Sequence, residues 1–212
     1  MKMGIYQKVS VLAVSAVVFS GVSNLSAQDS PQATNILANP GFEEGVKGWN
    51  DRNSGECDDK VFHQGNYSGL IKRKGEKGKD VHISQTVPLP VAGSKVDGSA
   101  WVKTSTPDVE YRVYCDIATQ KTDGTKEWFA TEGIDWQKNP DDEWKEVKFS
   151  FTFPSDPTDK DGNITKKICS FYFRLLTNDK CAGDIWFDDA SLVVTPPPSG
   201  ATTQPKSGNT AK

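Results

Sequence analysis

The 212-residue sequence is poor in histidine and cysteine. It has two histidines and four cysteines, with no Cys-x-x-Cys pair, so zinc and dithiol redox sites are poorly supported. It also lacks the Gly-x-Ser-x-Gly turn that presents a nucleophilic serine. Its paired acids, such as Asp188 and Asp189, are neighbours that a strand would point to opposite faces, whereas acid–base hydrolysis needs carboxylates facing across a cleft. No catalytic residue is predicted.

Long apolar runs are also missing. The run from Val9 to Phe19 is too short to cross a bilayer. Lys2 and Lys8 precede this run, and Leu-Ser-Ala at 25–27 resembles a cleavage site with small residues. The pattern is typical of a secretory signal peptide over residues 1–27. We therefore expect a secreted protein, extracellular, periplasmic or on the cell surface, with no membrane insertion.

The rest of the chain divides by composition. Residues 196–212 are rich in Pro, Ser, Thr and Gly without apolar periodicity, which predicts a disordered tail. Residues 28–34 are a linker, and 35–195 are enough for one domain with a core. Without the four lysines of the two ends, 25 basic residues fall to 21 against 28 acids, a net charge of −7. That charge argues against nucleic acid, and against polyanions in general, as partners.

Four cysteines in an exported chain favour disulfides, and three connectivities are possible. Cys115 and Cys169 share the core parity of their predicted strands, whereas Cys57 and Cys181 fall in polar segments. This parity favours pairing Cys115 with Cys169 and Cys57 with Cys181. Free buried thiols are the alternative.

Short alternating runs separated by Gly, Pro, Asn and Asp recur along the domain, and no helical stripe interrupts them. They predict an all-β fold, a two-sheet antiparallel β-sandwich. The predicted strands are 36–38, 60–63, 68–73, 81–89, 95–104, 109–118, 126–131, 145–153, 168–177 and 184–194.

Alternation also separates a core face from an outer face on two of these strands. Val, Tyr, Cys, Phe and Leu occupy the core positions of 109–117 and 169–175. The outer positions carry Arg112, Tyr114 and Asp116 on the first strand, and Tyr172 and Arg174 on the second. Rings alternating with charged groups suit a sugar, which stacks its C–H face on an aromatic ring and offers hydroxyls to charged side chains. Each stacked ring is worth about 1–2 kcal/mol, so we expect weak binding.

Six tryptophans refine this prediction. Trp49, Trp101, Trp144 and Trp186 are expected to pack in the core or at strand edges. Trp128 follows the hairpin signal at 122–126 and is the best candidate for an exposed sugar platform.

Five segments in order resemble the carbohydrate-binding modules of families 4, 9 and 22. They are Asn-Pro-Gly-Phe-Glu at 39–43, the segments 65–71, 99–103 and 143–153, and Trp-Phe-Asp-Asp-Ala-Ser-Leu at 186–192. The resemblance implies a jelly-roll topology and a ligand groove on a concave sheet. It also implies a structural calcium that ties the first strand to the last through Glu43, Asp188 and carbonyl groups near Gly41, Gly65 and Asn66. The alternative is that Glu43 caps a turn and Asp188 is solvated.

The sequence as a whole predicts non-catalytic binding of a polysaccharide or oligosaccharide, of the β-glucan or xylan class by resemblance. Such modules usually accompany a glycoside hydrolase, so a separate hydrolase or a cell-surface protein is a candidate partner. Two alternatives stay open: a small secreted jelly-roll glycoside hydrolase or lyase, and a structural or adhesive module without a sugar site.

Overall fold

The computed structural model describes residues 34–52, 55–75 and 81–198. The predicted signal peptide, most of the linker and residues 199–212 of the predicted tail lie outside the described residues. No helix in the described part of the chain is long and apolar enough to cross a membrane.

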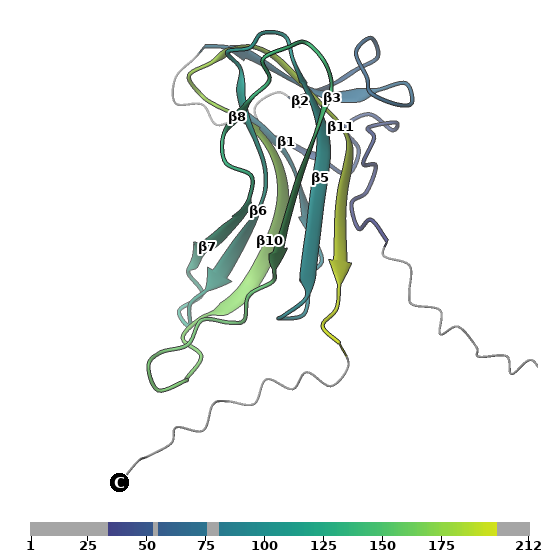
Figure 1. Ribbon diagram of the computed structural model, residues 1–212. Coiled ribbons are helices and arrows are strands. Elements are labelled where there is room, and N and C mark those ends of the chain that lie inside the picture. Colours follow the sequence, from purple (N-terminus) through teal and green to yellow (C-terminus); the bar gives the residue numbers. More distant parts are fainter. Residues whose placement is uncertain (1–33, 53–54, 76–80, 199–212) are drawn as a thin grey trace, which may run out of the picture. The chain divides into compact units, whose positions relative to one another are not determined.

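Two antiparallel sheets form the domain, as predicted (Figure 1). The six-stranded sheet has the order β1 (Asn50–Arg52), β4 (Val81–Val87), β10 (Lys167–Thr177), β6 (Glu110–Gln120) and β7 (Lys126–Gly133), with β8 (Gln137–Lys138) also paired to β6. The five-stranded sheet has the order β2 (Gly55–Asp58), β3 (Ser68–Lys74), β11 (Ala182–Thr195), β5 (Lys95–Thr104) and β9 (Lys145–Thr152). Neighbouring strands are mostly distant in sequence because the chain crosses repeatedly between the sheets, which is the jelly-roll arrangement.

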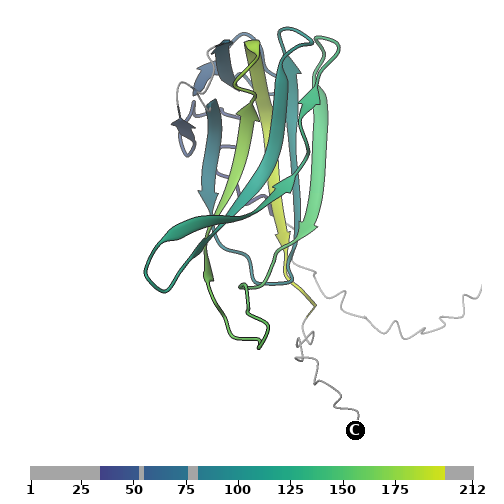
Figure 2. The same ribbon diagram turned by 90° about the vertical axis from the view of Figure 1, so that its left-hand side faces the viewer.

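The core lies between the sheets and follows the predicted alternation. On β6, Val113, Cys115 and Ile117 are fully buried, and on β10 Phe171 and Phe173 are fully buried as well. The two layers meet through their rings: Phe149 and Phe173 stack with centroids 6.4 Å apart, and Phe153 packs edge-on against Phe171 at 5.2 Å. The apolar residues of β6 and β10 point into the core between the two sheets. The alternate side chains of these strands therefore lie on the outer face of the six-stranded sheet. Figure 2 looks onto this side.

Two predicted strands are absent from the described residues, at 36–38 and 60–63. Asn35 makes a single β-bridge with Val193. Its side-chain oxygen then accepts hydrogen bonds from the backbone N–H groups of Leu37 and Leu192, in place of continued pairing between two strands. After β2, Lys60 N–H donates to Asp58 Oδ1 in a side-chain turn that ends the strand. The backbone N–H of His63 donates to the Asp188 carboxylate instead of to a strand.

The predicted disulfides are wrong: all four cysteines are free. Cys115 lies opposite Phe173, four residues or about 13 Å along β10 from Cys169. Cys57 on β2 pairs with Gly69 near the start of β3. Cys181 immediately precedes Ala182 of β11, which pairs with Lys74 at the other end of β3 and on the opposite edge of that strand. Neither pair can approach the short Cα separation that a disulfide needs.

Candidate functional site

The predicted ligand residues come together on the outer face of the six-stranded sheet. Antiparallel pairing of β6 with β10 places Arg174 opposite Tyr114 and Tyr172 opposite Asp116. The β6–β7 hairpin adds Trp128, which lies opposite Ala118 on the far side of β6. We call this set the arginine–aromatic surface: Arg112, Tyr114, Asp116, Trp128, Tyr172 and Arg174.

Arg174 is the fixed centre of one half of this surface. Its Nε lies 2.8 Å from Asp116 Oδ2, and one terminal nitrogen lies 3.3 Å from His82 Nε2 on β4. The other Asp116 oxygen accepts the Thr131 hydroxyl at 2.6 Å. Arg174 and Asp116 are each only 8% exposed. A charge pair this buried depends on its partners, so both side chains are held in place.

Trp128 is the exposed ring of the same half. It is 62% exposed, its centroid is 5.8 Å from that of Tyr172 at a steep angle, and the Arg174 guanidinium carbon lies 4.9 Å from it. A β-bulge between Ile117 and Ala118 shifts the register so that Trp128 follows the same face as Thr131. An apolar ring thus lies beside hydrogen-bonding groups that are already oriented.

Arg112 organises the other half. Its guanidinium carbon lies 4.8 Å from the Tyr114 ring and 5.8 Å from the Trp136 ring, and its Nε donates to the Ile134 carbonyl at 3.1 Å. Tyr114 is only 6% exposed, so it supports Arg112 and is not an open platform. Gly133 lies opposite Tyr114, where an added Cβ would come within 2.5 Å of the tyrosine backbone. Glycine is therefore required at 133 for this close packing.

The predicted calcium corner also has its parts together, but in a different arrangement. Glu43 Oε1 accepts the backbone N–H of Asn66 at 2.9 Å and of Tyr67 at 3.1 Å. The Asn66 hydrogen bond is the main cause that holds the pKa of Glu43 below its ordinary value. At Gly65, whose φ is +71°, an added Cβ would overlap the Glu43 carboxylate at 2.1 Å. Glu43 therefore closes over the turn at 65–67.

Asp188 is fully buried beside this turn. Its Oδ2 accepts from the backbone of His63 at 2.8 Å and of Gln64 at 3.2 Å, and burial raises its pKa to about 6 despite these bonds. A Cβ built on Gly41 would lie 3.7 Å from Asp188 Oδ1, 3.6 Å from Asp189 Oδ1 and 4.0 Å from Glu43 Cγ, so three acidic side chains surround Gly41.

These oxygens are of the kind that calcium prefers. However, within the described ranges no group of three or more His, Cys, Asp and Glu side chains is placed to hold a metal ion. A cation at this corner would need carbonyl oxygens in addition to the carboxylates.

Comparison with known proteins identifies the fold family. A family model described as "Carbohydrate binding domain" (CBM_4_9) matches residues 34–167. The chain belongs to this family. The match includes Glu43, Arg112 and Trp128, and ends before Tyr172, Arg174 and Asp188.

Solved structures agree on the fold of this carbohydrate-binding domain. A "Family 16 Carbohydrate Binding Module-2" is 19% identical with a TM-score of 0.53, covering 75% of this chain and 99% of the other. A module named as the CBM22-1 xylan-binding domain of Paenibacillus barcinonensis Xyn10C is 15% identical with a TM-score of 0.56, covering 78% and 97%. The CBM22-1–GH10 modules of Clostridium thermocellum Xyn10B, complexed with xylohexaose, are 14% identical with a TM-score of 0.54, covering 76% and 29%. No curated protein matches the chain.

Sequence reasoning missed three members of the domain's outer face: Trp136, His82 and Thr131. Trp136 lies in the irregular segment between β7 and β8, where no alternation assigns a face. Its 42% exposure is visible only in three dimensions. His82 and Thr131 could have been found, since each lies on a correctly predicted strand and becomes relevant once the strand order is known.

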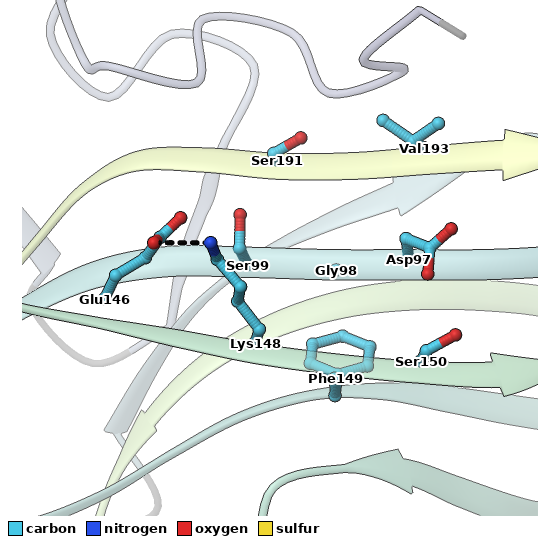
Figure 3. Close-up of a pocket in the computed structure, with 9 residues that line it drawn as sticks. All are labelled: Asp97, Gly98, Ser99, Glu146, Lys148, Phe149, Ser150, Ser191 and Val193. Atoms are coloured by element: carbon cyan, nitrogen blue, oxygen red, sulfur yellow. Dashed lines mark ion pairs between the residues drawn. The ribbon is translucent and has the colours of Figure 1, made fainter.

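A cavity of about 570 Å³ lies on the other sheet of the domain (Figure 3). β5, β9 and β11 line it mainly with small hydroxyl side chains and charges that are already paired, such as Glu146 with Lys148 at 2.6 Å. Phe149 is the one aromatic side chain lining this cavity, and its ring belongs to the stacked core. This cavity therefore lacks an exposed ring for stacking, whereas the arginine–aromatic surface has one.

Proposed function

We propose that the domain binds a polysaccharide or oligosaccharide, of the β-glucan or xylan class, through the arginine–aromatic surface and without cleaving it. Membership of a carbohydrate-binding domain family supports the general activity. The xylan class is supported by the names of fold neighbours, which describe xylan-binding modules.

One observation carries the placement of the site: Trp128 is largely exposed beside a buried ion pair. A sugar that stacks on Trp128 removes apolar surface from water and gains about 1–2 kcal/mol. Its hydroxyls then meet Arg174, Asp116 and Thr131, whose mutual contacts keep them oriented before the ligand arrives. Preorganised groups lose little conformational entropy on binding, which raises affinity.

The spacing of the two exposed tryptophans supports a ligand of several linked sugars. Trp128 lies opposite Ala118, and Trp136 contacts Arg112, six residues earlier on β6. Six residues of strand span about 20 Å. A ligand that reaches both rings must be a chain, so we propose binding of an oligosaccharide stretch.

Affinity electrophoresis through gels containing xylan, mixed-linkage β-glucan or hydroxyethylcellulose tests this function. We expect retardation in at least one gel, and calorimetry with the matching oligosaccharides to give weak affinity, between about millimolar and micromolar. Protein that migrates alike in every gel would favour the structural or adhesive alternative. A reducing-sugar assay on the same polymers addresses the hydrolase alternative, and a positive result in that assay would replace binding with catalysis.

We also propose that calcium binds at the corner formed by Glu43, Asp188 and the turn at 65–67. Support comes from the burial of Asp188 and from the three acidic side chains around Gly41. Carbonyl groups near Gly41, Gly65 and Asn66 would complete the oxygen ligands. When bound, calcium would neutralise acids that are otherwise close to one another.

A further inference from the structure

We propose that Arg112 binds the carboxylate of an acidic sugar substituent, so that the preferred ligand is a largely neutral glycan carrying sparse uronic acid groups. This proposal rests on the proposed function, because it assigns a substrate class to the same surface. Its basis is the difference between the two arginines of that surface.

Arg112 is half-buried and lacks a negative partner. Its Nε donates to the Ile134 carbonyl, and its flat faces lie near Tyr114 and Trp136. Among the described residues, no carboxylate forms an ion pair with Arg112, and its two terminal nitrogens have no hydrogen-bond acceptor. Those nitrogens form a planar fork whose geometry matches a carboxylate.

The two acids on the same face of β6 as Arg112 are engaged elsewhere. Glu110, two residues earlier on the same face of β6, accepts from Asn178 Nδ2 at 2.6 Å and lies 3.7 Å from Lys138 Nζ. Asp116, four residues later, is held by Arg174 and Thr131. A half-buried cation is costly when it is uncompensated, so this position favours an anion from outside the protein.

Arg174 shows the opposite arrangement. It is paired with Asp116 at 2.8 Å and is 8% exposed, so its charge is satisfied within the domain. The surface therefore has a neutral half at Trp128 and a cationic half at Trp136. A neutral sugar fits the first half, and a sugar with a carboxylate fits the second, with its ring against the 42% exposed Trp136.

The net negative charge of the protein limits how many carboxylates a bound glycan can carry. Residues 28–195 carry seven more acids than bases, and this excess would repel a polymer with a carboxylate on every sugar. A single carboxylate on a neutral backbone meets Arg112 without that penalty. Glucuronate-branched xylan is the corresponding probe, and polygalacturonate is the dense counterpart.

Calorimetry on glucuronoxylan, and on the same polymer after chemical reduction of its carboxyl groups to alcohols, tests the proposal. We expect the wild-type protein to bind the acid form at least about tenfold more tightly at low salt, since a charge-assisted bond is lost on reduction. The ratio should shrink as salt rises. Polygalacturonate should bind more weakly than glucuronoxylan.

Variants locate the effect. Arg112→Gln should bring the ratio of the two affinities close to one, and Arg112→Lys, which keeps the charge but loses the fork, should give an intermediate ratio. Lys95→Gln removes an exposed charge on β5 of the other sheet and should keep the wild-type ratio. Thermal melts confirm that each variant folds.

The outcomes separate the two proposals. Equal binding of both polymers by the wild-type protein, or an unchanged ratio in Arg112→Gln, would overturn the role of Arg112 and leave glycan binding intact. Absence of binding to both polymers and to all neutral glycans would instead overturn the proposed function.

Discussion

The guanidinium of Arg174 lies against the indole of Trp128, with 4.9 Å between the guanidinium carbon and the ring centroid. Arg174 is in turn fixed by Asp116 from the neighbouring strand. An exposed ring in contact with a buried ion pair has less freedom than an isolated surface tryptophan. Arg174 contacts both Asp116 and Trp128, so loss of the Arg174–Asp116 ion pair should destabilise the sheet and also free the Trp128 ring.

Trp128→Ala should weaken glycan binding without unfolding the domain. Loss of one stacked ring removes about 1–2 kcal/mol, which is about a 5- to 30-fold fall in affinity by calorimetry. Phe62→Ala is a suitable control, because Phe62 is another exposed aromatic residue, in the loop between β2 and β3. Equal affinities for the wild type and both variants would show that the glycan binds elsewhere.

Asp116→Ala should destabilise the fold more than a surface substitution does. Removing one partner of a buried pair leaves the Arg174 charge uncompensated, at a cost of roughly 3 kcal/mol in the free energy of unfolding. Asp116→Ala with Arg174→Met should cost less than the sum of the two single changes. Urea denaturation of all four proteins gives the coupling, and strictly additive losses would show that the pair contributes nothing as a unit.

The composition of the arginine–aromatic surface could largely be predicted because two long strands alternate regularly. Arg112, Tyr114 and Asp116 share one parity on β6, and Tyr172 and Arg174 share one on β10. Alternation predicts which face of the sheet a side chain lies on, but not which other side chain it contacts. The neutralisation of Arg174 by Asp116 depends on the pairing of β10 with β6, and the placement of Trp128 on the face of Thr131 depends on the bulge before Ala118. Neither feature has a local signal in the sequence.

Prediction of the fold was weakest where side chains replace backbone pairing. The long strands β5, β6, β9 and β10 were placed to within two residues because their apolar positions repeat with period two. Residues 36–38 and 60–63 were also predicted as strands, but side-chain oxygens of Asn35, Asp58 and Asp188 accept the backbone N–H groups of Leu37, Lys60 and His63. Such local hydrogen bonds compete with a ladder and end it.

The cysteines can be tested directly. Since all four are free, denatured protein prepared without reductant should react with four equivalents of a thiol reagent per chain. Reductant should leave the melting temperature unchanged, because there is no cross-link to remove. A titre of two or none would show that cysteines pair in spite of their separation on different strands.

Chelation tests the corner that joins Glu43 to Asp188. If calcium binds there, EDTA should lower the melting temperature by roughly 5 °C or more, because a ligand that binds only the folded state stabilises it. Added calcium should restore the temperature, and magnesium should not, since magnesium requires stricter octahedral geometry. The comparison of the two cations shows whether the change in melting temperature is specific to calcium.

Two neighbouring glutamates provide a matched pair of variants for the same test. Glu43→Gln should abolish the response to EDTA, because it removes a proposed ligand, whereas Glu44→Gln should keep it, because Glu44 pairs with Lys47 on the surface. A melting temperature that is identical with and without EDTA in the wild type would mean that hydrogen bonds alone close the corner. The backbone N–H groups of His63, Gln64, Asn66 and Tyr67, which already donate to the two carboxylates, would then account for its stability.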